Sequence, residues 1–162
     1  MKLCKPYRSP LQAVFIIAFT VVMVLLSAAL VRYFPDIAVY LRLTGGAFLL
    51  LGAVLLFRYT LTEFVYVLSE NTLTVRRIIG LTERVVATLT LDINVELYTK
   101  AQFKKIKTAG GKSYRQNITA NTAYLVFEKR KRRHYIEIEP NAPFYALIKA
   151  ELDKNKEDKE NK

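Results

Sequence analysis

Residues 11–31 read LQAVFIIAFTVVMVLLSAALV, and residues 37–57 read IAVYLRLTGGAFLLLGAVLLF. The first run carries no charged side chain, and the second carries only Arg42. A helix of about 20 apolar residues, rising about 1.5 Å per residue, spans a bilayer core of about 30 Å. Only RYFPD at 32–36 joins the two runs, so both ends of this link must lie on the same side of a membrane. Residues 11–57 therefore predict a two-helix transmembrane hairpin.

The charges that flank this hairpin predict its orientation. Residues 1–10 contain Lys2, Lys5 and Arg8 and no acid, and the segment after the hairpin opens with Arg58. Because cytoplasmic flanks of membrane spans carry an excess of Lys and Arg, both termini are expected in the cytoplasm. The sequence thus predicts a multi-pass protein of the cell (plasma) membrane with a basic cytoplasmic N-terminus.

Three glycines stand out in the second run, at Gly45, Gly46 and Gly52. Small residues let membrane helices approach closely. Gly45 and Gly52 are seven residues apart and share one helix face. This face is expected to pack on the first helix, and a contact between two copies of the chain is the alternative that the sequence leaves open.

A small β domain is expected after the hairpin, at residues 58–153. Its strand-like runs are separated by turn signals, a pattern typical of an all-β sandwich or barrel. The runs are at 64–68, 73–79, 84–91, 114–119, 124–128 and 134–139, with weaker candidates at 94–98 and 103–107 and a loop at 108–112.

The end of the domain has a helical pattern instead. Phe144, Leu147, Ile148 and Leu152 share one stripe of a helix expected at 143–153. Residues 154–162 contain no apolar side chain and are expected to form a charged tail without stable structure. The fold class predicted is an α+β membrane protein: a transmembrane hairpin, a small antiparallel β sandwich or barrel, and a capping C-terminal helix.

The chain is basic, with a formal net charge of +11. Residues 58–162 contain 20 of the 25 Lys and Arg residues and 13 of the 14 acids, which gives this part +7. Nucleic acid and anionic phospholipid both attract such a domain, at about 1 kcal/mol per well-placed cation for lipid. The membrane tether makes lipid the expected partner. The single cysteine, Cys4, excludes an intrachain disulfide.

The most concentrated charge lies between two expected strands, at a hairpin tip. It consists of five consecutive cations, Lys129, Arg130, Lys131, Arg132 and Arg133. Cations at this density repel one another unless an anion is near, so the tip is a candidate contact for phospholipid headgroups or another phosphate-bearing ligand. A solvated tip without a ligand is the alternative, and the sequence does not decide between them.

No pattern in the chain indicates catalysis, a metal or a cofactor. Gly110 and Gly111 precede Lys112, but the first glycine of a nucleotide-binding loop is missing, since Ile106 stands in its place. His134 has no metal-ligating companions nearby and is expected on a strand surface. Asp92 and Glu96 would lie about 13 Å apart on a strand, too far for a working dyad. A protein without enzymatic activity and without a cofactor is therefore expected.

Residues 64–98, FVYVLSENTLTVRRIIGLTERVVATLTLDINVELY, resemble the start of bacterial pleckstrin-homology-like domains. The matching positions are Tyr66, Leu68, Leu73, Val75, Arg76, Arg77, Gly80, Arg84, Leu89 and Ile93. The resemblance extends over residues 59–152, and the family includes forms with two preceding membrane spans. It implies two roughly orthogonal antiparallel sheets whose open end is plugged by the last helix, and it implies no catalytic residue.

Together these features predict a membrane-anchored binding module without enzymatic activity. Its cytoplasmic β domain would bind a protein partner or anionic lipid headgroups. The alternative function is a subunit or accessory protein of a membrane transport or envelope complex, with the helical hairpin as its contact surface. A partner in the membrane or a second copy of the chain is compatible with either function.

Overall fold

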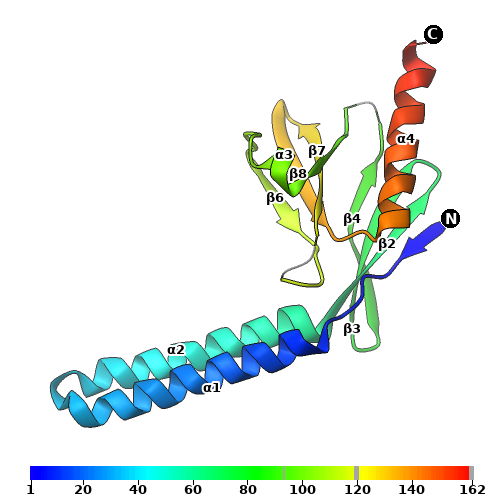
Figure 1. Cartoon of the computed structure of the whole chain (residues 1–162). Helices are drawn as coiled ribbons and strands as arrows, with labels where there is room; N and C mark the ends of the chain where they lie inside the picture. Colours follow the sequence, from blue (N-terminus) through cyan, green and yellow to red (C-terminus); the bar gives the residue numbers. More distant parts are fainter. Residues whose placement is uncertain (93, 119–120, 161–162) are drawn as a thin grey trace. The chain divides into compact units, whose positions relative to one another are not determined.

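The computed structural model describes residues 1–92, 94–118 and 121–160, without the side chains of 158–160. The chain forms two compact units: a helical unit, Arg8–Thr62, and a β unit, Met1–Tyr7 together with Glu63–Lys162. The fold is α+β, with a hairpin of two long apolar helices, two four-stranded sheets and a C-terminal helix (Figure 1).

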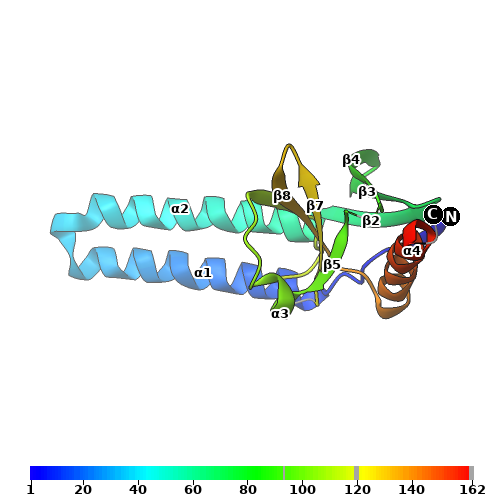
Figure 2. The same ribbon diagram turned by 90° about the horizontal axis from the view of Figure 1, so that it is seen from above.

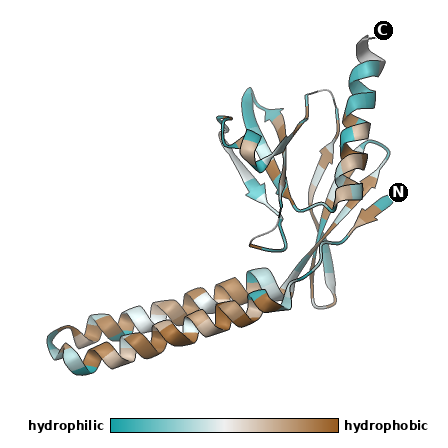
Figure 3. Cartoon of the chain, in the orientation of Figure 1, coloured by the Kyte–Doolittle hydropathy of each residue, from teal (hydrophilic) through white to brown (hydrophobic). Residues whose placement is uncertain are grey.

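The helical unit is an antiparallel hairpin. Helix α1 (Pro10–Tyr33) leads through the short 3₁₀ turn η1 (Pro35–Ile37) into α2 (Ala38–Leu56), which ends in the π-helical turn η2 (Phe57–Leu61). The two helices lie side by side in both views (Figures 1 and 2) and are apolar along most of their length (Figure 3). Each is long and apolar enough to cross a membrane.

The three glycines of α2 have different surroundings. A Cβ at Gly52 would lie 2.7 Å from Cγ2 of Thr20 on α1, and one at Gly45 would lie 3.4 Å from Cβ of Ser27. A Cβ at Gly46 would meet no atom of the described residues within 4 Å. Gly45 and Gly52 therefore allow α1 and α2 to approach closely, whereas Gly46 lies on an open surface.

The β unit contains two sheets of four strands each. The first has the order β1-β2-β3-β4, and the second has the order β5-β7-β8-β6. The first sheet consists of β1 (Lys2–Cys4), β2 (Thr62–Ser69), β3 (Thr72–Ile79) and β4 (Thr82–Thr90). The second consists of β5 (Glu96–Thr99), β6 (Gly110–Ser113), β7 (Ala123–Lys129) and β8 (Arg132–Ile138), with β6 parallel to β8.

Strand β1 was not predicted. Because of it, residues 1–7 belong to the β unit and do not form a separate N-terminal segment. The strand pairs antiparallel with β2, with Cys4 opposite Tyr66. Residues next to β1 add a 2.7 Å ion pair from Lys5 to Glu63 and a 2.6 Å hydrogen bond from the Asn117 side chain to the Tyr7 carbonyl. The helical hairpin is thus inserted between two neighbouring strands of one sheet.

One apolar core is shared by both sheets and the last helix, α4 (Ala142–Glu160). Tyr66 of β2 is fully buried, and its ring lies 6.4 Å from that of Phe144 on α4. Ile148 and Leu152 continue the buried stripe of α4 one and two turns further on. The first turn of α4 is capped by Asn141, whose side-chain oxygen accepts a 3.0 Å hydrogen bond from the Phe144 amide.

Helix α4 does not end at residue 153 but continues to Glu160. The expected tail without structure is therefore helical over 154–160. The side chain of Asn155 donates to the Asn71 side chain at 2.6 Å and to the Leu91 carbonyl at 2.5 Å. These two contacts hold the polar end of the helix against the β2–β3 turn and the end of β4, although it has no apolar stripe.

Three expectations between β5 and β7 were wrong. Helix α3 (Lys100–Phe103) replaces part of the weak strand candidate at 103–107, and it begins with a capping box between Thr99 and Gln102. The expected loop contains strand β6. Residues 114–118, expected as a strand, form none. The expected strand end at Thr119 and the matched position Ile93 lie outside the described residues.

Candidate functional site

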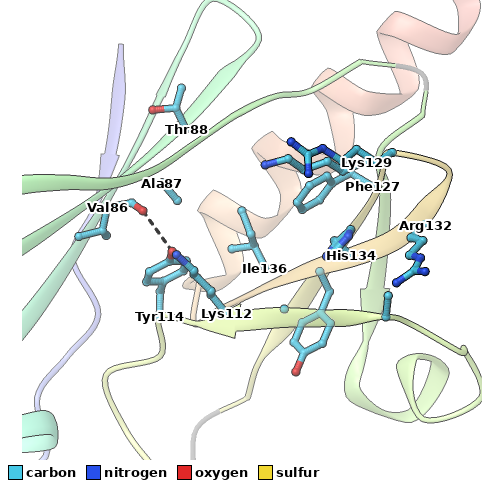
Figure 4. A pocket seen from close by; sticks show the side chains of 14 residues that line it. Val86, Ala87, Thr88, Lys112, Tyr114, Phe127, Lys129, Arg132, His134 and Ile136 are labelled. Atoms are coloured by element: carbon cyan, nitrogen blue, oxygen red, sulfur yellow. Dashed lines mark hydrogen bonds between the residues drawn. The ribbon is translucent and has the colours of Figure 1, made fainter.

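A groove of about 810 Å³ lies between β4 of the first sheet and β6, β7 and β8 of the second. Figure 4 shows side chains of both sheets around it. Its lining includes four apolar residues, which we call the floor, Val86, Ala87, Phe127 and Ile136, and four cations, which we call the rim, Lys112, Lys129, Arg130 and Arg132. No acidic side chain of the described residues lines it. We call it the inter-sheet groove.

A β-bulge shapes the β4 wall of the inter-sheet groove. Val75 on β3 pairs with Ala87, but the next residue, Arg76, pairs with Val85. Val86 is thus the extra residue on β4, and its carbonyl is displaced from regular ladder pairing. The hydroxyl of Tyr114 donates a 3.2 Å hydrogen bond to this carbonyl (Figure 4). The carbonyl of the bulged residue therefore accepts a hydrogen bond that connects the two sheets at the groove.

Tyr114 is held from several directions. The Tyr66 hydroxyl donates to the Tyr114 carbonyl at 2.7 Å and accepts a 3.1 Å hydrogen bond from the Glu139 amide. The Phe64 ring contacts the Tyr114 ring edge-on at 5.7 Å. Burial raises the pKa of the Tyr114 phenol, and the charge of Arg77 partly opposes this rise. Tyr114 therefore keeps its proton and remains a donor at neutral pH.

The register of β7 and β8 determines which cations face the inter-sheet groove. Lys129 lies opposite Arg132, and Phe127 lies opposite His134. These four residues line the groove, and Arg130 in the turn joins them. Because side chains alternate along a strand, Glu128 and Arg133 form the next pair, on the other face.

The five cations predicted as one contact are therefore divided. Lys129, Arg130 and Arg132 line the inter-sheet groove. Arg130 also borders a smaller cavity on the other side of the turn, together with Lys131. Arg133 lines neither cavity, since it lies on the opposite face of β8.

The turn between β7 and β8 is conformationally unusual. Arg130 and Lys131 are its two central residues, and their φ angles are +53° and +61°. Two-residue hairpin turns of this kind favour Asn-Gly, because other residues cost about 1 kcal/mol each in the left-handed region. Arg and Lys thus occupy positions where uncharged residues would make a more stable turn.

The sequence did not assign four residues to this site. Lys112 was placed in a loop, but β6 runs parallel to β8 and sets Lys112 beside Ile136. His134 was expected on a strand surface without a role, and it lines the groove from β8, with its ring centroid 6.3 Å from that of Phe127. Val86 and Tyr114 belong to the site only because the two sheets meet there. No sequence pattern within either segment predicts that the two sheets meet at this point.

The other polar residues considered from the sequence are not brought together. Asp92 accepts a 3.0 Å hydrogen bond from the Asn94 amide, while Glu96 accepts one of 2.6 Å from the Tyr98 hydroxyl. The described part of the chain contains no group of three or more His, Cys, Asp or Glu residues that could hold a metal ion.

Neither protein-family models, nor curated proteins, nor solved structures match this chain. The function must therefore be argued from the inter-sheet groove and the helical hairpin.

Proposed function

We propose that this protein is a membrane-anchored binding module without enzymatic activity, and that its β unit binds an anionic, phosphate-bearing ligand at the inter-sheet groove. The observation that carries the proposal is the composition of the rim. Four cations from β6, β7, β8 and the β7–β8 turn surround one cavity, and no acid of the described residues lines it. Such a single-sign lining attracts anions.

The β7–β8 turn supports the same conclusion independently. Lys129 and Arg132 are like charges in directly opposite positions, an arrangement that destabilises a strand pair. Arg130 and Lys131 adopt a left-handed backbone that favours Asn or Gly. A turn that is unfavourable in both respects is better explained by binding than by stability.

The anchor in this proposal is the hairpin of α1 and α2. We propose that it spans the plasma membrane with both of its ends in the cytoplasm, as the basic flanks indicate. The groove would then lie on the side of the leaflet that is rich in anionic lipids, where each well-placed cation adds about 1 kcal/mol of attraction. A pleckstrin-homology-like arrangement of the two sheets is part of the proposal, supported by the resemblance of residues 64–98.

The proposal is tested on the full chain in nanodiscs of phosphatidylcholine, titrated with vesicles that contain phosphatidylglycerol. Lys129→Gln, Arg130→Gln and Arg132→Gln together are expected to weaken binding by at least about tenfold. The matched control replaces three exposed cations outside the groove, Lys104, Lys105 and Lys107, by Gln. Equal losses in the two triple variants would reduce the effect to net charge and refute the assignment of the groove.

A second candidate function follows from Gly46. This glycine lies on an open surface of α2, with no atom of the described residues within 4 Å of a Cβ placed there. Small residues on an open helix surface allow another membrane helix to approach. The hairpin would then be the contact surface of a subunit in a membrane transport or envelope complex. Co-purification of a membrane complex with the wild-type chain, and its loss with Gly46→Leu, is the expected result.

A further inference from the structure

We propose that the ligand of the inter-sheet groove is one phospholipid-type molecule, with its phosphate on the cationic rim and an acyl chain along the apolar floor. This inference rests on the proposed function and names the class of ligand. It differs from binding of headgroups to an exposed tip, because it requires the chain of the lipid to leave the bilayer and enter the β unit.

The floor is the first argument. Val86, Ala87 and Phe127 are half-buried and pack against the core that both sheets share. Ile136 also lines the groove and is almost completely buried. An apolar group of a ligand that covered these side chains would remove them from water, which is favourable. A ligand with only a phosphate group would leave these side chains uncovered.

The distribution of polarity is the second argument. Lys129 and Arg132 form the next pair after Phe127 and His134 on the same face of β7 and β8, toward the turn, and Lys112 lines the cavity from β6 (Figure 4). Lys129, Arg130 and Arg132 thus lie at the end of the groove next to the β7–β8 turn, whereas Lys112 lies beside Ile136. A molecule that fits has a charged end and an apolar end, as a lipid phosphate does.

The size of the groove is the third argument. About 810 Å³ falls within the range of roughly 300–1,000 Å³ that is typical of pockets for small molecules and cofactors. A hydrated phosphate alone fills only a small part of such a volume. The membrane into which α1 and α2 are proposed to insert is the nearest source of a molecule with this shape.

The experiment compares two soluble probes that share a phosphate and differ in the chain: glycerol 3-phosphate and octanoyl-lysophosphatidic acid. Their binding to the full chain in phosphatidylcholine nanodiscs is measured by isothermal titration calorimetry, with empty nanodiscs subtracted. The chain-bearing probe is expected to bind at least about tenfold more tightly. Lys129→Gln with Arg132→Gln is expected to weaken both probes by a similar factor.

Ala87→Leu is the decisive variant, because it fills the floor and leaves every cation in place. It is expected to weaken binding of octanoyl-lysophosphatidic acid by a larger factor than binding of glycerol 3-phosphate, so that the preference for the chain is lost. The smaller change Ala87→Val serves if the leucine variant does not fold, as judged by circular dichroism.

The outcomes separate this inference from the proposed function. Equal binding of both probes to the wild-type chain, with loss in the charge variant, would overturn the lipid-chain assignment and leave the anion-binding function standing. Absence of binding by either probe would overturn both. Equal displacement of both probes by a hexaglutamate peptide, without any preference for the chain, would assign the groove to an acidic peptide and overturn the lipid assignment.

Discussion

The hydroxyl of Tyr114 donates a 3.2 Å hydrogen bond to the main-chain carbonyl of Val86, across the two sheets of the β unit. Val86 accepts this bond because the bulge in β4 removes it from regular pairing with β3. Tyr114 lies 28 residues further along the chain, directly after β6. This contact thus joins the two walls of the inter-sheet groove directly.

Replacement of Tyr114 by Phe is expected to lower the free energy of unfolding by about 1 kcal/mol, because the Val86 carbonyl loses its partner in a half-buried position. The measurement is urea unfolding of the full chain in a neutral detergent, followed by circular dichroism. Tyr135→Phe is the matched control, since among the described residues no hydrogen bond involves the Tyr135 hydroxyl. A similar loss in both variants would contradict the role of the contact.

The same tyrosine predicts a loss of stability at alkaline pH. Burial raises the pKa of Tyr114 above the ordinary value of 10.0, so the folded state retains a proton that the unfolded state releases. Its contribution is complete below about pH 10 and is lost as the pH rises through the folded pKa. The urea midpoint should therefore fall less steeply between about pH 9 and 11 in Tyr114→Phe than in the wild type. Parallel curves would show that Tyr114 does not carry the dependence.

The β7–β8 turn allows stability and binding to be changed in opposite directions. Arg130→Asn with Lys131→Gly places the residues favoured in a left-handed two-residue turn at the positions with φ of +53° and +61°. The double variant is expected to be more stable by about 1 kcal/mol and to bind anionic vesicles more weakly. Urea unfolding and vesicle titration measure the two effects. Tighter binding by the more stable variant would contradict a role of these cations in recognition.

Sequence reasoning succeeded where one element determines its own structure. The apolar runs at 11–31 and 37–57 predicted α1 and α2, and the alternation around Tyr66 and Val75 predicted β2 and β3. Sequence reasoning failed where the structure of a segment depends on its packing against a segment that is distant in the sequence. Gly111 suggested a loop, but in β6 a Cβ at this position would lie 2.5 Å from the Tyr135 ring, so glycine is required by close packing on β8.

The candidate site, too, could be predicted only in part. The five cations could be found as a charged tip, because they are consecutive and lie between two alternating strands. The inter-sheet groove could not, because its floor combines Val86 with Ile136, which are 50 residues apart and belong to different sheets. Strand β1 has only three residues and no periodicity, so its pairing with β2 left no signal in the sequence.

Because Cys4 lies in β1, the reactivity of its thiol reports whether β1 is paired with β2. The Cys4 side chain is buried, and burial raises the pKa of its thiol. Asn117→Ala removes the 2.6 Å hydrogen bond to the Tyr7 carbonyl, just after β1, and should raise the alkylation rate of Cys4 about fivefold in the native full chain. Asn121→Ala, at an exposed position, is the control. An unchanged rate would mean that other contacts alone hold β1 to β2.

The glycines of α2 predict different stability changes for the same substitution by alanine. Thr20 is fixed by a 2.8 Å hydrogen bond to the Ile16 carbonyl, so it cannot easily move away from a Cβ at Gly52.

Gly52→Ala should therefore separate the helices and lower the thermal midpoint of the hairpin. The added Cβ in Gly46→Ala would contact no neighbouring side chain of the described residues. This variant should therefore have the same thermal midpoint as the wild type or a higher one, because alanine favours the helix by about 0.5–1 kcal/mol relative to glycine. The midpoints are compared by circular dichroism in a neutral detergent. If Gly46→Ala were the harmful change, its open surface would be covered in solution, and the hairpin would be a contact surface between copies of the chain.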